Sequence, residues 1–251
     1  MKHIYGLIGY PLTHSFSKEY FSNKFRKEEI KDSVYENFEI RDVSELPGLL
    51  ASQPAIKGLN VTIPHKEGVI KYLGNIDPDA KRVGAVNVLK IMPDGKLKGY
   101  NSDYYGFRTS LERWLGTDLV NCKAMILGTG GAAKAVIAVL EDCNIETIRV
   151  SRSAGAERYT YFDIRKSAEM LKSCRLVINT TPLGMYPKIN EMPNLPFEAL
   201  TEEHYLYDLI YNPEKTLFLQ KGESMGCRIK NGREMLELQA EKSWQIWNNR
   251  E

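Results

Sequence analysis

The chain has 251 residues, of which 43% are hydrophobic and 26% are charged, and its formal net charge is +2. This length suits one large domain or two modest ones, and the composition is that of an ordinary globular protein. The near balance of 34 basic and 32 acidic side chains argues against a nucleic-acid binder or a protein of membrane surfaces.

The first hundred residues alternate strand-like and helix-like apolar patterns. We expect strands at 4–8, 35–40 and 58–63 and helices at 15–28, 46–52 and 66–73. Pro93-Asp94-Gly95 is a turn signal, and it predicts a hairpin of residues 86–92 and 96–100. Together these elements predict one α/β unit.

The rest of the chain repeats a strand–helix–strand rhythm, which predicts a parallel sheet. We expect strands at 122–127, 147–150, 176–179 and 205–209 and helices at 104–116, 132–143 and 164–173. A last apolar helical pattern runs from Met235 to Trp247 and is suited to packing back on the first unit.

The four cysteines stand far apart without a CxxC pair, which argues against a zinc site and against a disulfide framework. The four histidines are not spaced as metal ligands. Met1 to Gly9 lacks the apolar segment of a signal peptide, and no apolar run approaches the roughly 20 residues that span a bilayer. We therefore expect a soluble, cytoplasmic protein without a metal.

A glycine-rich loop, Gly128-Thr129-Gly130-Gly131-Ala132-Ala133, follows an apolar strand and opens a helix. This context is typical of dinucleotide-binding loops. Gly128 would permit the tight turn, Gly130 would let the backbone approach a pyrophosphate, and Ala133 would let helix and strand pack closely. The N–H groups at the helix start would attract phosphates. The alternative is a glycine-rich turn without a ligand.

The residues after the next strand bear on the choice of cofactor. An acidic residue there would bind the ribose of NAD, but the chain has Ser151-Arg152-Ser153. The Arg152 guanidinium suits a 2′-phosphate, with Ser151 and Ser153 as further donors. Judged alone, Arg152 is an ordinary solvated arginine. The missing carboxylate favours NADP over NAD.

Four polar clusters stand at or just past the expected strand ends of the first half. They are residues 9–17, 60–66, 84–87 and 101–103. Ligands of open α/β sheets bind outside the carboxyl ends of strands, so hydroxyls, amides, Lys66 and Asp103 would converge there. Such a set suits a small polyhydroxylated acid. Each cluster also has a structural alternative, since serines cap helices, asparagines occupy turns and Asp103 is a potential helix N-cap.

The ordered set of motifs resembles the shikimate dehydrogenase family. The matching blocks are Gly9-x-Pro11-x-x-His14-Ser15-x-Ser17, Asn60-Val61-Thr62-Ile63-Pro64-x-Lys66, Gly84-Ala85-Val86-Asn87, Asn101-Ser102-Asp103, Gly128 to Ala133, Asn179 to Met185, Asp208-Leu209-Ile210-Tyr211 and Gly232-x-x-Met235-x-x-x-Gln239. The chain departs from the family pattern at Lys18, where proline is frequent, and at Ser151-Arg152-Ser153, where Asn-Arg-Thr is frequent.

The resemblance implies an α/β fold of two domains with a cleft between them. Residues 1–103 would form the substrate-binding domain and residues 104–233 a Rossmann-type domain, with the last helix, 234–251, returning to the first. The implied activity is the reversible, NADPH-dependent reduction of 3-dehydroshikimate to shikimate, a step of aromatic amino-acid biosynthesis. The partner would be this small molecule rather than nucleic acid or membrane, and the protein would be a monomer or a homodimer.

The resemblance also implies residue roles. Lys66 and Asp103 would form the catalytic pair. The substrate would be bound by Ser15, Ser17, Asn60, Thr62, Asn87, Tyr211 and Gln239. The cofactor would be bound by Gly128, Gly130, Gly131, Ala132, Ser151, Arg152, Ser153, Thr180, Leu209 and Gly232.

The chemistry agrees with these roles. Hydride delivery to a ketone builds negative charge on its oxygen, and an ammonium such as that of Lys66 can stabilise the charge and give up its proton. Four alternatives remain: an enzyme that uses quinate or NAD, a folate-type dehydrogenase, a ligand sensor without activity, and a structural protein without a ligand, which would leave the ordered motifs unexplained. The Ser15 and Ser17 cluster argues against the second, and retention of Lys66 and Asp103 argues against the third.

Overall fold

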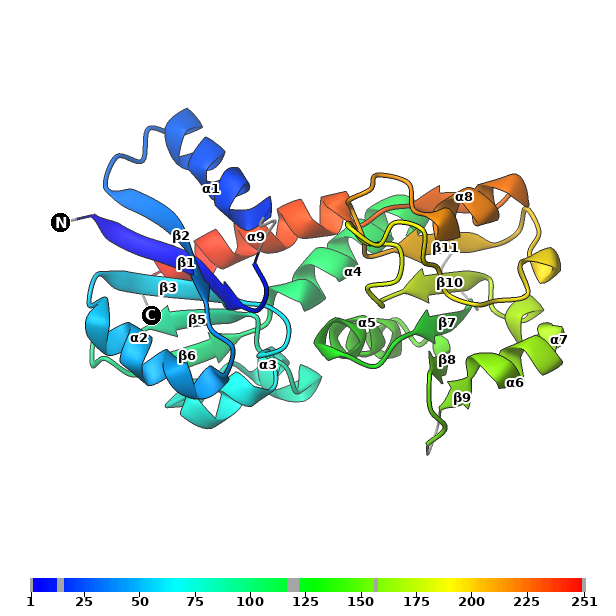
Figure 1. The fold of residues 1–251 in the computed structure, drawn as a ribbon, viewed down its shortest axis with the longest axis horizontal. Coiled ribbons are helices and arrows are strands. Elements are labelled where there is room, and N and C mark those ends of the chain that lie inside the picture. The colour runs from blue at the N-terminus through cyan, green and yellow to red at the C-terminus, as the bar shows by residue number, and fades with distance from the viewer. Residues whose placement is uncertain (1, 13–15, 117–121, 156–157, 250–251) are drawn as a thin grey trace. The chain divides into compact units, whose positions relative to one another are not determined.

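The chain forms two compact units, each built on one six-stranded sheet. The computed structural model describes residues 2–12, 16–116, 122–155 and 158–249. The first unit comprises Met1–Ser102 and Gln239–Glu251, and the second comprises Asp103–Leu238. The prediction of an α/β protein with two domains is confirmed (Figure 1).

The sheet of the first unit has the strand order β2-β1-β3-β5-β6-β4. Its strands are β1 (His3–Gly9), β2 (Ser33–Glu39), β3 (Ile56–Val61), β4 (Asn75–Ile76), β5 (Val88–Ile91) and β6 (Leu97–Tyr100). β1 runs parallel to both β2 and β3, whereas β5 runs antiparallel to β3 and β6. The predicted hairpin is therefore present as β5 and β6.

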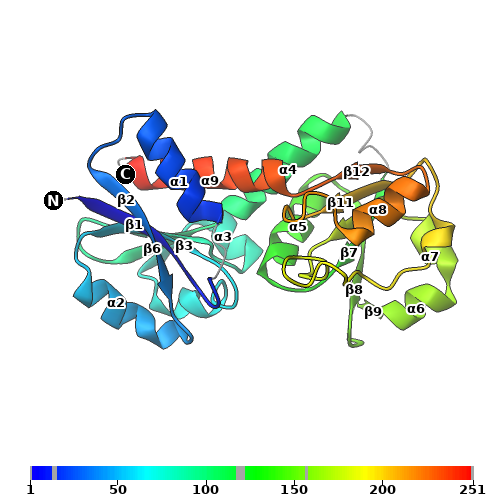
Figure 2. The ribbon, with the colours of Figure 1, turned by 45° about the horizontal axis from the view of Figure 1, so that its top comes forward.

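Helices cover both faces of this sheet, and the strands alternate their apolar side chains between the two faces (Figures 1 and 2). One face packs against α1 (Phe16–Lys27) and the end of α9 (Arg233–Asn248). The other packs against α2 (Leu46–Ser52) and α3 (Pro78–Val83).

Three elements of this unit differ from expectation, and one of them is the two-residue strand β4, which the sequence did not predict. The segment predicted as a helix over 66–73 is a short 3₁₀ helix, Gly68–Tyr72, closed by bonds such as that from the Leu73 N–H to the Ile70 carbonyl, 3.2 Å. α3 was not predicted, although Asp77 caps it, Pro78 opens it and Gly84 ends it with φ of +69°. Its six residues are too few to show a helical period.

The second unit has the strand order β12-β11-β10-β7-β8-β9, and all of its strand pairs are parallel. Its strands are β7 (Lys123–Leu127), β8 (Glu146–Ser151), β9 (Tyr159–Thr160), β10 (Leu176–Asn179), β11 (Tyr205–Asp208) and β12 (Arg228–Lys230). A parallel sheet is buried on both faces, which explains the continuous apolar runs that revealed its central strands. The prediction of a parallel sheet is confirmed.

Helices again cover both faces. One face packs against α4 (Ser102–Leu115), α5 (Gly131–Asp142) and the start of α9. The other packs against α6 (Tyr161–Lys166), α7 (Ala168–Lys172) and α8 (Leu217–Ser224). The helix predicted over 164–173 is thus two short helices that part at Ser167, and α8 was missed. No helix among the described residues is long and apolar enough to cross a membrane.

Aromatic side chains form the packing between α9, α1 and the first sheet. The ring of Trp247 stacks on that of Tyr5 at 4.9 Å, and its Nε1–H donates to the Leu89 carbonyl at 3.0 Å. A Cβ atom on Gly58 would lie 2.3 Å from the Trp247 ring, so only glycine lets this ring lie against β3. Trp247 therefore fixes the end of α9 on the sheet.

We expect Trp247→Ala to lower the free energy of unfolding by about 3–5 kcal/mol, because it empties a closed site and removes a hydrogen bond from a buried carbonyl. Trp244→Ala, on the same helix, is the matched control, and since Trp244 is only half-buried its loss should be clearly smaller. Urea unfolding followed by circular dichroism measures both. Equal losses in the two variants would contradict the role given to Trp247.

Candidate functional site

The polar clusters of the first unit meet at one edge of its sheet. β1 and β3 end at this edge because they are parallel, while β5 starts and β6 ends there because they are antiparallel to their neighbours. The Val61 N–H donates to the Asn87 carbonyl at 2.8 Å, and the Asn87 N–H donates to the Tyr100 carbonyl at 3.1 Å. Along this edge of the first sheet lie, in order, Thr62, Asn87 and Asn101.

The side chain of Asn87 holds the start of α4. Its Oδ1 accepts the Ser102 N–H at 2.7 Å, and its Nδ2 donates to the Ser102 hydroxyl at 3.0 Å. Asn101 Nδ2 donates to the Ala85 carbonyl at 2.8 Å, which joins two of the four clusters. Asp103 is not the helix N-cap that its sequence position suggests, because α4 begins at Ser102; Asp103 lies in the first turn and is buried.

Three residues expected at the substrate share one buried network. Asn60 Nδ2 donates to the Ser243 hydroxyl at 2.9 Å, and Asn60 Oδ1 accepts from the Tyr35 hydroxyl at 2.8 Å. Gln239 Oε1 accepts from the Ser102 hydroxyl at 3.2 Å, which connects it with Asn87.

Ser17 reaches the same network, since its hydroxyl hydrogen-bonds with Tyr35. Burial raises the pKa of Tyr35, against the effect of this bond, so Tyr35 stays a neutral hydroxyl. Ser15 and His14, which were expected near Ser17, lie outside the described residues.

The segment that carries Lys66 is anchored by its backbone. The Lys66 carbonyl accepts the Val86 N–H at 2.8 Å, and the Thr62 N–H donates to the Ile8 carbonyl at 2.9 Å. A Cβ on Gly9 would lie 2.4 Å from Thr62 Cγ2, so this glycine makes room for the threonine. The Lys66 side chain is half-buried.

The glycine-rich loop of the second unit has the geometry that a dinucleotide needs. Gly128 has φ of +113°, and a Cβ there would lie 2.5 Å from Thr180 Oγ1, so only glycine fits the turn. Gly130 is exposed, and a Cβ there would meet nothing within 4 Å. The first N–H groups of α5 are thus open to a phosphate. Thr180 Oγ1 donates to the Leu127 carbonyl at 2.7 Å and supports the turn from β10.

The loop after β8 presents Arg152 on the surface. Ser151 is buried, and its hydroxyl donates to the Ser153 carbonyl at 2.5 Å. The Ser151 hydrogen therefore holds the turn, and the neighbouring Arg152 presents its charge to solvent.

A buried carboxyl ties together the loops that follow β10 and β11. Asp208 accepts from the Thr216 hydroxyl at 2.6 Å, from the Ile210 N–H at 3.0 Å and from Asn179 Nδ2 at 3.0 Å. Burial raises the pKa of the Asp208 carboxyl to about 7, although these three hydrogen bonds act to lower it. Asp208 belongs to the matching block Asp208-Leu209-Ile210-Tyr211, but the sequence alone does not predict a role for it.

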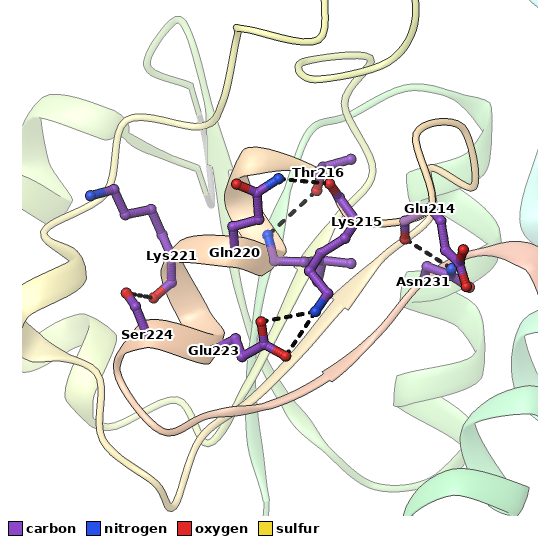
Figure 3. A network of polar contacts seen from close by, with 9 residues as sticks. Glu214, Lys215, Thr216, Gln220, Lys221, Glu223, Ser224 and Asn231 are labelled. Atoms are coloured by element: carbon purple, nitrogen blue, oxygen red, sulfur yellow. Dashed lines mark hydrogen bonds and ion pairs between the residues drawn. The ribbon is translucent and has the colours of Figure 1, made fainter.

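Figure 3 shows the surface contacts that brace the same region around α8. Lys215 pairs with Glu223 at 2.9 Å, and Asn231 Nδ2 donates to the Glu214 carbonyl at 2.9 Å. A Cβ on Gly232 would lie 2.0 Å from the Leu209 carbonyl oxygen, so glycine is required for this close approach of two loops. Tyr211, in the loop that follows β11, is half-buried.

No three histidine, cysteine, aspartate or glutamate side chains of the described residues are grouped as metal ligands. His65 is buried with its Nε2 2.8 Å from the Ile40 carbonyl. The four cysteines are free thiols.

These features define a class: a two-unit α/β protein with a dinucleotide-binding fold in one unit and a buried polar site in the other. The family model of the shikimate dehydrogenase substrate binding domain matches residues 7–89. A shikimate dehydrogenase (NADP(+)) of Clostridium beijerinckii is 41% identical over 97% of this chain and 91% of its own length.

Solved structures of shikimate dehydrogenases are similar to this chain over nearly its full length. A shikimate dehydrogenase in complex with NADP+ is 33% identical with a TM-score of 0.85, covering 100% of this chain and 91% of its own. The enzyme of Thermus thermophilus in complex with NADP(H) and shikimate is 28% identical with a TM-score of 0.83, covering 98% and 93%. The chain belongs to the shikimate dehydrogenase family.

The Asp208 carboxyl predicts a pH dependence of stability. Its pKa in the folded chain, about 7, lies above the roughly 3.9 of an unfolded aspartate, so the folded state holds the extra proton. The stabilisation is fully present below pH 4 and is lost as pH rises towards 7.

We expect the unfolding free energy of the wild type to fall, relative to Asp208→Asn, by about 1 kcal/mol per pH unit between pH 5 and 7 and to level off above pH 8. Urea unfolding at four pH values measures this difference. A difference that does not change with pH would show that Asp208 is ionised throughout.

Proposed function

We propose that the protein is an NADP-dependent shikimate dehydrogenase, which reversibly reduces 3-dehydroshikimate to shikimate in aromatic amino-acid biosynthesis. The similarity to enzymes of this name over nearly the full chain carries the proposal. The polar edge of the first sheet and the open glycine loop of the second unit supply what such a reaction needs.

The second unit would hold the cofactor. Its loop from Gly128 to Ala132 offers an open helix start to the pyrophosphate. Arg152 would bind the 2′-phosphate, with Ser153 as a further donor and with Ser151 holding the turn through its bond to the Ser153 carbonyl. Further contacts would come from Thr180, Leu209 and Gly232. When bound, NADPH supplies the hydride for the carbonyl carbon.

The first unit would hold the substrate. Ser15 and Ser17 are assigned to its carboxylate together with Tyr211, and the ring hydroxyls to the amides and hydroxyls of the edge: Asn60, Thr62, Asn87 and Gln239. A polyhydroxylated ring needs many directed donors and acceptors, and buried amides of fixed orientation provide them.

Lys66 and Asp103 are assigned to proton transfer. In the reduction, Lys66 Nζ would stabilise the oxygen as charge builds on it and would give it a proton, and in the oxidation it would take the proton back. Asp103, a buried carboxyl in the first turn of α4, would orient the lysine and the substrate hydroxyl.

The protein is further proposed to work in the cytoplasm as a monomer or a homodimer. Its four unpaired thiols are consistent with a reducing compartment.

A four-way assay tests the function. Initial rates are measured with shikimate and with quinate, each with NADP and with NAD. We expect activity chiefly with shikimate and NADP. Preference for quinate or NAD would overturn the specificity, and no activity in any combination from folded protein would overturn the function.

We expect Lys66→Ala to lower kcat by roughly 10²–10⁴-fold while the KM for shikimate changes little, because the proton donor is lost in the transition state. Lys71→Ala, an exposed lysine of the following 3₁₀ helix, is the matched control and should keep its rate. Steady-state kinetics measure both, and a nearly normal kcat for Lys66→Ala would remove its role.

We expect Arg152→Ala to raise the KM for NADPH by roughly 10–100-fold, since a charge-assisted hydrogen bond to phosphate is lost, and to leave the KM for NADH nearly unchanged. Arg165→Ala, an exposed arginine of α6, is the control. Equal changes for both cofactors in Arg152→Ala would exclude a contact with the 2′-phosphate.

A further inference from the structure

Three buried hydroxyls connect the residues assigned to the substrate. They belong to Tyr35, Ser102 and Ser243, whose exposed fractions are 3%, 0% and 0%. Tyr35 lies on β2, Ser102 opens α4, and Ser243 lies one helical turn beyond Gln239 on α9. None of the three has a role in the function proposed above.

The hydrogens of this cluster can be followed one by one. The Ser243 hydroxyl donates to the Gln239 carbonyl at 2.8 Å, so its oxygen is left to accept. It accepts from Asn60 Nδ2 at 2.9 Å and lies 3.1 Å from Ser102 Oγ. The Ser102 hydroxyl hydrogen is therefore directed towards Ser243, Gln239 Oε1 or Asn87 Oδ1, which lie at 3.1, 3.2 and 3.3 Å.

This arrangement fixes the amide of Asn60. Its Nδ2 must face the Asn87 carbonyl, at 3.3 Å, and Ser243, since a carbonyl can only accept. Its Oδ1 then faces the Tyr35 hydroxyl at 2.8 Å. Both amide hydrogens are used inside the protein, and the remaining lone pair of Oδ1 is what Asn60 can offer to a substrate hydroxyl.

The amide of Asn87 is fixed in the same way. Its Oδ1 accepts the Ser102 N–H at 2.7 Å, and one Nδ2 hydrogen is given to Ser102 Oγ at 3.0 Å. Among the described residues, no acceptor takes the second Nδ2 hydrogen, although the side chain is buried. Asn87 therefore presents one donor in a set direction.

Packing alone does not require these hydroxyls. Apolar side chains of the same volume would fill the positions without the cost of burying polar groups, which is repaid only when each group is bonded. The hydroxyls accomplish something that an apolar core cannot: they hold two asparagine amides in one of their two orientations.

We propose that Tyr35 and Ser243 are positioning residues of the shikimate site, which act by orienting Asn60 and, through Ser102, Asn87 and Gln239. This inference rests on the proposed function. Neither residue needs to touch the substrate for its hydroxyl to set the affinity for it.

The experiment compares Tyr35→Phe and Ser243→Ala, each of which removes one hydroxyl, in the full-length protein. The matched controls are Tyr207→Phe and Ser110→Ala in the second unit, whose hydroxyls form an equivalent buried pair at 2.8 Å and whose exposed fractions are both 0%. Steady-state kinetics with shikimate and NADP are recorded for all variants, with thermal unfolding to verify folding.

We expect each first-unit variant to raise the KM for shikimate by roughly 5–10-fold, the worth of about one hydrogen bond, with the KM for NADP unchanged. The double variant should lose less in kcat/KM than the product of the single losses, because both hydroxyls act on the Asn60 amide. In the variant that combines Tyr35→Phe with Tyr207→Phe, the loss in kcat/KM should equal the product of the two single losses, because these hydroxyls lie in different units. The control variants should lower the unfolding temperature without raising the KM for shikimate.

If the wild type is active and both first-unit variants keep its KM for shikimate, the inference is overturned while the proposed function stands. An equal increase of the KM for shikimate in the control variants would also overturn the inference. An inactive wild type would overturn the proposed function and this inference with it. If Ser243→Ala does not fold, Tyr35→Phe and its control decide the question by themselves.

Discussion

The hydrogen bond from the Ser102 N–H to Asn87 Oδ1, 2.7 Å long, is the constraint on which the first unit's polar edge depends. It satisfies one of the N–H groups that every helix leaves unpaired at its start. It also holds Ser102, the residue at which α4 begins. Because Asn87 is itself bonded to β3 and β6 through its backbone, Ser102 is held at this edge of the sheet.

In the second unit, a carboxyl rather than an amide joins the segments that follow neighbouring strands. Asp208 gathers three donors from the segments after β10 and β11, whereas Asn87 gathers donors and acceptors with a neutral amide. The carboxyl accepts more bonds, but burial makes its charge costly, which is why its pKa rises to about 7. A neutral amide carries no charge whose burial costs free energy, but it can rotate so that its oxygen and nitrogen exchange places. The need to prevent this rotation explains the hydroxyls around Asn87.

The sequence predicted those parts of the fold that local patterns encode. Apolar runs located the central strands, and the turn signal at Pro93 located the hairpin. Short elements such as α3, β9 and β12 were not predicted, because a helix of six residues or a strand of two or three shows no recognisable period. Ser243 escaped for another reason: its partner Asn60 lies 183 residues away, and only the folded chain brings them together. The i,i+4 spacing from Gln239 was a signal that could have been used.

The buried network also bears on selectivity. A site whose donors and acceptors can rotate adapts to a ligand that lacks a hydroxyl, at little cost. When the Asn60 oxygen and the Asn87 hydrogen are held in place, a ligand without the matching group leaves a buried polar atom unpaired. An unpaired buried polar atom lowers the affinity for the wrong ligand far more than a missing methylene group does. The ordering of these side chains is completed on folding, so binding need not supply it. A polyhydroxylated ring is the kind of ligand for which this arrangement is an advantage, because each of its hydroxyls can be tested against a fixed partner.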